Sequence, residues 1–374
     1  MRIKAAVLRE STRGLPYDLT QPMEIAEVDL APPGPGEVLV AIKAAGLCHS
    51  DLSVVNGDRP RPLPMVLGHE AAGVVEAVGD GVIDLAPGDH VVSVFMPNCG
   101  HCLPCAEGRP ALCEPGALAN GGGMLTGGHA RLSENAHALH HHLGVSAFAE
   151  RAVVSRRSLV PVPRDIPFVE AALFGCAVLT GVGAVVNTAR LTMGSTAAVV
   201  GLGGVGLAAL LGARAAGASR IVAVDLSPDK LALAADLGAT DTVNAADPDC
   251  VEQVRALTGG GVDFGFEMAG SIRALASALA MTRRGGTTVT AGLPPAGSAL
   301  PVDVVQLVGE ERTLKGSYMG SCVPSRDIPR YIQLYREGRL PVKRLLSGTL
   351  TLDQINQGFD RLHDGSAVRQ VILF

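Results

Sequence analysis

The segment from Ala197 to Ala239 constrains the fold of this chain more than any other. It reads as an apolar strand, a glycine-rich turn, an apolar helix, a second strand and an amphipathic helix, which is a βαβ unit. Short apolar runs recur at 262–270 and 285–293, and helical patterns separate them. Because parallel strands are joined by crossovers of this kind, the pattern predicts a doubly wound parallel sheet of the α/β class.

The turn inside this unit carries a phosphate-binding pattern. Gly201, Gly203 and Gly206 form G-x-G-x-x-G between strand and helix, and Asp225 ends the next strand about twenty residues later. Such glycines let the backbone approach a pyrophosphate, which meets the positive end of the helix dipole. The alternative to dinucleotide binding is a glycine-rich turn that serves only the packing of strand and helix. Asp225 would bind the ribose 2′-hydroxyl and repel a 2′-phosphate, which favours NAD over NADP. Lys230 could reach the ribose or remain solvated.

The sequence outside the βαβ region predicts a second domain, which is built mainly from β-strands. Residues 1 to about 95 alternate short β-type runs with Pro/Gly turns, which is typical of an antiparallel, barrel-like fold. From Cys99 to about Leu143 the periodicity disappears, so we expect an aperiodic functional excursion there. We predict a catalytic domain over 1–177 and 321–374, with a lobe at about 97–115, and an NAD-binding Rossmann domain over 178–320.

Composition excludes several classes of protein. The chain has 374 residues, 47% of them hydrophobic, which is enough for two cores. Its start lacks the apolar block of a secretory signal, so we expect a cytoplasmic protein. The run from Gly194 to Ala213 has the length of a membrane span, but its glycines and strand-turn-helix pattern argue against one. The net charge of −5 and the lack of a basic stripe argue against nucleic acid. A small-molecule partner is predicted.

Eight cysteines in a reducing compartment point to metal binding or catalysis rather than disulfides. Four of them form C-x2-C-x2-C-x7-C and could enclose a tetrahedral zinc ion with no open position, which defines a structural site: Cys99, Cys102, Cys105 and Cys113. An iron–sulfur cluster or chance buried cysteines are the alternatives. Cys250 and Cys322 have no ligand-like neighbours, and we expect both to be structural.

A dispersed set offers a second metal site. Cys48, His69 and Cys176 would give zinc two thiolates and one imidazole, leaving the fourth position for water or substrate. Taken alone, Cys176 is more typical of a buried core residue than of a ligand. Asp51 and Glu70 lie beside the proposed ligands and could hold the imidazole by its second nitrogen or tune the charge of the metal. They could equally be solvated loop carboxylates.

With GHE at 68–70, the four-cysteine loop, GLGGVG at 201–206 and the terminal VRQVILF in this order, the chain resembles the zinc-containing medium-chain alcohol dehydrogenases over essentially its whole length. The resemblance implies a GroES-like catalytic domain and two zinc ions per chain, one catalytic and one structural. It assigns the catalytic ion to Cys48, His69 and Cys176, with Glu70 as neighbour or alternate ligand. The segment before Leu143 resembles the vertebrate-type branch, which implies a homodimer, with a tetramer as the alternative.

The resemblance also implies roles for single residues. His49 and Arg369 would bind the pyrophosphate, Thr180 and Val205 would face the nicotinamide, and Asp225 and Lys230 would bind the ribose. The whole turn would contact the cofactor: Gly201, Leu202, Gly203, Gly204, Val205 and Gly206. Ser50 matches the hydroxyl that passes the substrate proton outward, while Ser53 stands where the next relay group is often histidine. The substrate pocket would be lined by Ser50, Phe95, His142 and Leu143. The tract that ends in His140–His142 is more typical of a solvated loop than of a ligand set.

The predicted reaction is reversible hydride transfer between a primary or secondary alcohol and NAD, giving an aldehyde or ketone. A thiol-dependent formaldehyde dehydrogenase of glutathione or mycothiol type is the alternative within enzymes. The position after Cys113 lacks the arginine of the glutathione-dependent branch, which disfavours this alternative. A zinc-stabilised NAD-binding sensor or scaffold is the alternative outside enzymes, and it predicts one zinc ion per chain.

Overall fold

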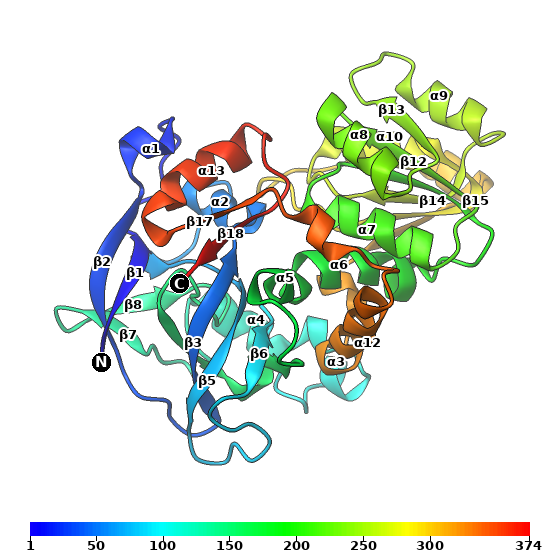
Figure 1. Ribbon diagram of the computed structural model, residues 1–374. Helices are drawn as coiled ribbons and strands as arrows, with labels where there is room; N and C mark the ends of the chain where they lie inside the picture. Colours follow the sequence, from blue (N-terminus) through cyan, green and yellow to red (C-terminus); the bar gives the residue numbers. More distant parts are fainter. The chain divides into compact units, whose positions relative to one another are not determined.

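The computed structural model describes residues 1–374 and divides into two compact units. The first unit comprises Met1–Cys176, Val323–Pro329 and Leu346–Phe374, and the second comprises Ala177–Cys322 and Arg330–Leu345. Figure 1 labels their elements. The bounds given above for the catalytic and the NAD-binding domain stay a prediction.

The first unit contains a closed barrel (Figure 1). Its strands follow the order β1 (Arg2–Leu8), β2 (Met23–Leu30), β7 (Leu132–Glu134), β8 (His137–His141) and β4 (Met65–Val66). β4 and β8 run parallel, with Val66 opposite His141, whereas the other neighbours are antiparallel. An apolar core that includes Ile3, Val28 and Leu139 fills the barrel. The predicted barrel-like, GroES-type domain is confirmed.

A seven-stranded, mainly antiparallel sheet completes this unit. Its strands are β10 (Leu159–Pro161), β6 (His90–Ser93), β5 (Glu70–Val78), β3 (Glu37–Gly46), β18 (Gln370–Leu373) and β17 (Gly348–Leu350), with β9 (Arg151–Ser155) also paired to β3. The register sets Gly46, at the end of β3, opposite both Glu70 and Val371. Three chain segments that are far apart in sequence therefore meet at one end of β3.

The region from Cys99 to Leu143 is more regular than the sequence suggested. It contains α3 (Leu103–Ala106), η1 (Pro110–Leu112) and α4 (Glu114–Gly121) before β7 and β8. The expectation of an aperiodic excursion is wrong for β7 and β8, which belong to the barrel. Strands this short show almost no alternation, and a histidine at the buried position 141 hid what little there is.

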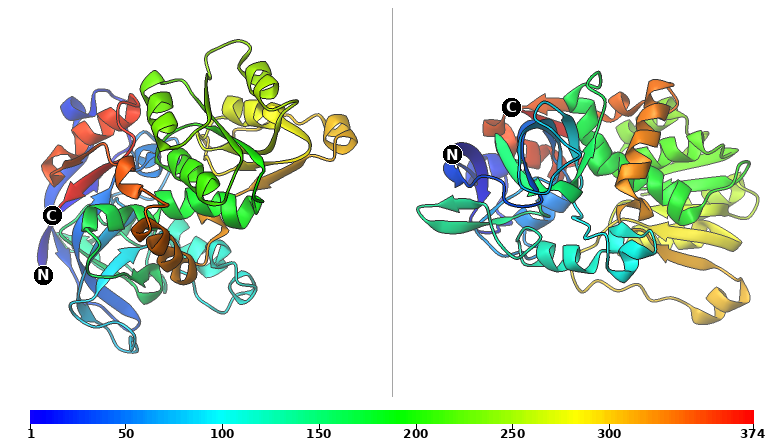
Figure 2. Two further views of the ribbon diagram at one scale, coloured as in Figure 1. Left: turned by 45° about the vertical axis from the view of Figure 1, so that its right-hand side comes forward. Right: turned by 90° about the horizontal axis from the view of Figure 1, so that it is seen from below.

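The second unit is built on a six-stranded parallel sheet in the order β13 (Asp241–Asn244), β12 (Arg220–Asp225), β11 (Thr196–Val200), β14 (Val262–Glu267), β15 (Thr282–Thr290) and β16 (Thr313–Gly316). The crossovers include α7 (Gly204–Ala215), α8 (Pro228–Leu237), α9 (Cys250–Leu257) and α10 (Ile272–Met281), which pack against the sheet (Figure 2). Because β11 pairs with both β12 and β14, the strand order reverses there, where nucleotides bind in such sheets. The predicted doubly wound sheet is confirmed.

The remaining elements complete the two units. In the first unit they are α1 (Tyr17–Thr20), α2 (His49–Val55), η2 (Arg156–Ser158), α5 (Phe168–Ala172), η3 (Leu173–Gly175), η7 (Leu352–Gln354) and α13 (Ile355–His363). In the second they are α6 (Ala177–Gly183), η4 (Ala184–Ala189), α11 (Val304–Gly309), η5 (Met319–Ser321) and η6 (Val342–Leu345), and α12 (Pro324–Arg336) has residues in both.

The apolar run from Gly194 to Ala213 forms β11, the glycine turn and part of α7. No single helix of the chain has the length and apolar character to cross a membrane. One bent pair, Phe168–Gly175 with Ala177–Ala189, meets the criteria of length and composition alone.

Candidate active site

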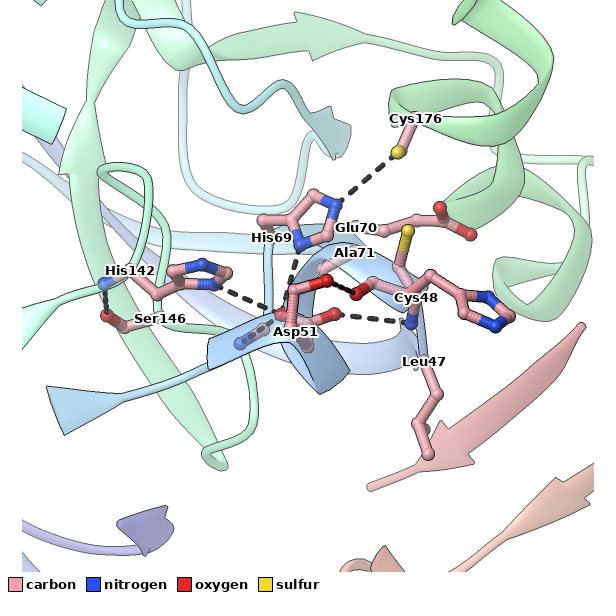
Figure 3. A network of polar contacts seen from close by, with 12 residues as sticks. Leu47, Cys48, Asp51, His69, Glu70, Ala71, His142, Ser146 and Cys176 are labelled. Atoms are coloured by element: carbon pink, nitrogen blue, oxygen red, sulfur yellow. Dashed lines mark hydrogen bonds and ion pairs between the residues drawn. The ribbon is translucent and has the colours of Figure 1, made fainter. Parts of the chain in front are cut away.

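The three residues of the dispersed set meet in the first unit. Cys48 follows β3 and precedes α2, His69 immediately precedes β5, and Cys176 follows η3. Their ligand atoms all lie within 4.8 Å of one another, and all three side chains are buried. Cys176 Sγ lies 3.4 Å from His69 Nε2 (Figure 3). Two sulfurs and one imidazole nitrogen facing a common point fit a zinc ion that keeps one open position.

Asp51 holds the imidazole of His69 in the orientation that a metal ligand needs. Its Oδ1 atom lies 3.0 Å from His69 Nδ1 and accepts the N–H of Gly68, while Oδ2 accepts the N–H of Cys48 (Figure 3). A carboxylate can only accept, so the proton of His69 resides on Nδ1 and the lone pair of Nε2 faces the sulfurs. Burial opposes ionisation, but the charge of His69 and the polar contacts with His142 and His69 lower the pKa of Asp51.

The two thiols of this site differ in acidity. A hydrogen bond from Cys176 is the largest of the effects that lower the pKa of Cys48, and the same bond, together with burial, raises the pKa of Cys176. The metal-free pair therefore shares one proton more readily than it loses both. Zinc requires thiolate ligands, so binding at this site would release a proton.

Glu70 and Arg369 form a buried ion pair next to the thiols. Glu70 Oε2 lies 3.4 Å from Arg369 Nη1, and the same guanidinium donates to the carbonyl of Leu47 at 2.9 Å. Burial raises the pKa of Glu70 to about 7, while the charge of Arg369 acts in the opposite direction. A Cβ at Gly46 would collide with the Glu70 carboxyl group, so a larger residue there would displace this buried carboxyl from its present position. Asp51 and Glu70 are buried, so the interpretation of both as solvated loop carboxylates is wrong.

The four-cysteine loop forms a second cluster. The sulfur atoms of Cys99, Cys102, Cys105 and Cys113 lie within 4.8 Å of one another. Backbone N–H groups point at these sulfurs: Cys99 N lies 3.1 Å from Cys113 Sγ, and Cys102 N lies 3.3 Å from Cys99 Sγ. Backbone hydrogen bonds lower the pKa of Cys99 to about 6. Four convergent sulfurs with N–H donors fit a closed, structural zinc site.

In the second unit the glycine turn lies between β11 and α7. Gly201 has φ +92°, and a Cβ there would lie 2.7 Å from Ala269 N, while a Cβ at Gly206 would collide with the Gly201 carbonyl oxygen. Gly203 faces open space, as a position beside a bound pyrophosphate should. Asp225 Oδ2 accepts the N–H of Leu202 at 2.6 Å. Asp225 thus also braces the turn, which the sequence did not suggest.

The other predicted cofactor residues are divided between the units. His49, the first residue of α2, and Arg369 belong to the first unit, whereas Thr180, Val205 and Lys230 belong to the second. Thr180 is buried within α6. Lys230 is half-buried near the start of α8, where its N–H faces Ser227 Oγ. The cofactor roles of these residues stay predictions.

Two of the four predicted pocket residues, Phe95 and His142, lie against His69. The rings of Phe95 and His142 lie edge-on to the His69 ring, with centroids 5.6 and 5.5 Å away. Leu143, which follows His142 in the chain, is also buried. Ser50 lies in the first turn of α2. The hydroxyl of Ser53, the predicted relay position, donates to the carbonyl of His49.

The histidine tract is not a solvated loop. Its members His141 and His142 are 1% and 2% exposed, so that expectation is wrong for both. The contact of His142 with Asp51 was missed, because no local pattern links two residues so far apart in sequence.

The two remaining cysteines lie in the interior. Cys250 and Cys322 are buried, and Cys322 Sγ donates to the carbonyl of Leu179.

The comparisons with known proteins agree with this geometry. The model of the alcohol dehydrogenase GroES-like domain matches residues 34–164, and that of the zinc-binding dehydrogenase domain matches 204–337. An S-(hydroxymethyl)glutathione dehydrogenase of a Synechocystis species is 40% identical over 367 residues, which are 97% of this chain and 99% of that protein.

Two solved structures are also similar over the whole length. An alcohol dehydrogenase zinc-binding domain protein from Burkholderia ambifaria is 38% identical, and benzyl alcohol dehydrogenase from Acinetobacter calcoaceticus is 34% identical. Each has a TM-score of 0.93, with 100% of this chain and 99% of the other covered. NAD(H) and zinc are the cofactors expected for such proteins. With both cysteine sites, the glycine turn and these matches, the chain belongs to the zinc-type medium-chain alcohol dehydrogenase family.

Proposed function

We propose that this chain catalyses reversible hydride transfer between NAD and a substrate that carries a hydroxymethyl or carbonyl group, at the site formed by Cys48, His69 and Cys176. The observation that carries the proposal is the convergence of three buried ligand atoms within 4.8 Å, with the His69 tautomer set by Asp51. A sensor or scaffold would need only the zinc ion of the four-cysteine site. The second cluster, with three ligands and one open position, has no task in such a protein.

For the substrate we favour the hydroxymethyl adduct of a small thiol, with an ordinary primary alcohol as the second candidate. The first rests on the 40% identity to a relative named for S-(hydroxymethyl)glutathione. The second rests on the 34% identity to benzyl alcohol dehydrogenase and on Glu114, which follows Cys113 where the glutathione-dependent branch has arginine. Both substrates present the same reacting group, a carbinol carbon with its hydroxyl.

The residues of the chain have separate tasks in this reaction. The bound metal would supply Lewis acidity at the substrate oxygen, and the bound nicotinamide would supply the hydride acceptor. Cys48, His69 and Cys176 would hold the metal, and Asp51 keeps the proton of His69 on Nδ1. The Ser50 hydroxyl would accept the proton that leaves the substrate. Phe95 and His142 pack edge-on against the buried ring of His69.

We further propose NAD as the preferred cofactor and a homodimer as the assembly. The carboxylate of Asp225 at the end of β12 would repel a 2′-phosphate, which supports NAD. The dimer is supported by one edge of the parallel sheet: β16 pairs only with β15 and is largely exposed, and Val305 and Val308 on α11 are 84% and 71% exposed. Exposed strand edges and apolar side chains are usually covered by a partner.

The test combines metal analysis with turnover. We expect two zinc ions per wild-type chain. We expect NADH to form fastest with formaldehyde plus a small thiol such as glutathione, and more slowly with benzyl alcohol and ethanol. Cys48→Ala and His69→Ala should lose the second zinc ion and turnover while still binding NAD. Cys250→Ala, which removes a buried cysteine of the second unit, should keep both the second zinc ion and turnover. One zinc ion per wild-type chain, or turnover in either active-site variant, would refute the proposal.

A further inference from the structure

One buried carboxylate oxygen lies between two histidines. Asp51 Oδ1 is 3.0 Å from His69 Nδ1 and also 3.0 Å from His142 Nδ1 (Figure 3). Asp51 is 0% exposed and His142 is 2% exposed, so neither exchanges this contact for water. The contact of His142 is a close polar one at ion-pair distance and not a formed hydrogen bond, because its Nδ1 atom has no hydrogen-bond partner in the structure. Three other groups approach the same carboxylate: His69 and the N–H groups of Gly68 and Cys48.

We propose that His142 is a positioning residue, which fixes the carboxylate of Asp51 and through it the metal-binding imidazole of His69. The proposal rests on the proposed function of the Cys48, His69 and Cys176 site. The reasoning is geometric. Rotation of the Asp51 carboxylate would have to break its contacts with both imidazoles at once, so His142 restrains the group that orients the ligand.

The fold delivers His142 to this point by strand register. β8 ends at His141, and it runs parallel to β4 with His141 opposite Val66. The two strands leave the barrel together, so His142 emerges beside the segment that leads through Gly68 to His69. This juxtaposition follows from the barrel and not from any local motif.

The backbone after His142 is pinned in an unusual conformation. Leu143 and Ser146 have φ values of +51° and +56°, which are uncommon for residues with side chains. The hydroxyl of Ser146 accepts the N–H of His142 at 3.0 Å, and the N–H of Val145 donates to the His142 carbonyl. Strained backbone of this kind persists where the surroundings hold it, and it is frequent where a side chain must be aimed.

A matched pair of variants separates the polar contact of His142 Nδ1 from the packing of its ring. His142→Asn places an amide nitrogen near the position of Nδ1, whereas His142→Phe keeps an aromatic ring against His69 but removes the donor. His137→Phe, which replaces an exposed histidine of β8, is the control. The readouts are the retention of the second zinc ion against a chelator and the visible absorption of the cobalt-substituted enzyme, which reports ligand geometry. The zinc of the four-cysteine site shows that each variant is folded.

We expect His142→Phe to lower zinc affinity at the dispersed site about 10-fold, the lower end of the range for outer partners of metal ligands, and to shift the cobalt spectrum. His142→Asn should stay within about 3-fold of the wild type, and His137→Phe should not differ from it. If His142→Phe does not fold, His142→Leu serves as the donor-free variant.

Two results would overturn the inference: a donor-free variant with wild-type zinc affinity and spectrum, or equal losses in the Asn and donor-free variants, which would indicate packing alone. A wild type with only one zinc ion would instead refute the proposed function, and the inference with it.

Discussion

At the scale of single residues, two carboxylates of this protein each hold more than one partner. Buried Asp51 contacts two histidines and two backbone N–H groups, and half-buried Asp225 accepts the N–H groups of Leu202 and Ser227. Buried polar groups must be satisfied, so such residues order the segments around them. Buried His141 has one such bond, since its Nε2 accepts the N–H of Arg131 while its Nδ1 has no hydrogen-bond partner.

His141 should make stability depend on pH. Burial, with smaller contributions from nearby positive charges, lowers its pKa from 6.5 to about 3. Below pH 6.5 the unfolded chain gains a proton that folded His141 does not take up until about pH 3. The free energy of unfolding therefore falls as pH falls, by about 1.4 kcal/mol per pH unit and about 2 kcal/mol by pH 5.

Urea unfolding of His141→Gln from pH 7 to pH 5 tests this, because glutamine keeps an acceptor but does not titrate. We expect a shallower loss of stability than in the wild type, and no change in slope for His137→Gln on the same strand. Equal slopes for the wild type and His141→Gln would contradict the assignment.

At the scale of elements, two glycines of the turn between β11 and α7 allow effects on NAD binding to be separated from effects on stability. A methyl group at Gly203 meets no atom within 4 Å, so Gly203→Ala should melt like the wild type but bind NAD at least about 10-fold more weakly, a loss of ~1.4 kcal/mol. A methyl group at Gly206 would collide with the Gly201 carbonyl, so Gly206→Ala should cost about 1–3 kcal/mol of stability. Calorimetric NAD titration and thermal melts measure both. Wild-type NAD affinity in Gly203→Ala would show that no pyrophosphate approaches this residue.

At the scale of the whole molecule, the exposed edge of the parallel sheet predicts an assembly. Charges at Val305 and Val308 should oppose burial of this surface, so V305E/V308E should sediment near the 38.3 kDa of one chain while the wild type sediments as a dimer. Ile83→Glu changes a residue that is 95% exposed in the first unit and should leave the dimer intact. The measurement is sedimentation velocity across a range of protein concentrations. A dimer in the double variant would place the interface elsewhere.

Local spacing was enough to predict part of this protein. The βαβ unit and the four-cysteine loop were recognisable because their residues lie close together in sequence, where turn geometry and metal coordination set the spacing directly. The strands β7 and β8 were missed because so few residues carry no clear period. The dispersed ligands were identified through the family resemblance and not through spacing.

Only the tertiary structure decided which distant residues meet. The register of β3 with β5 and β18 brings Cys48, Glu70 and Arg369 together, and the pairing of β4 with β8 brings His142 to Asp51. A shift of one residue in either register would turn these side chains to the opposite face. Register depends on the packing of whole strands into barrel and sheet, and no short stretch of sequence contains that information.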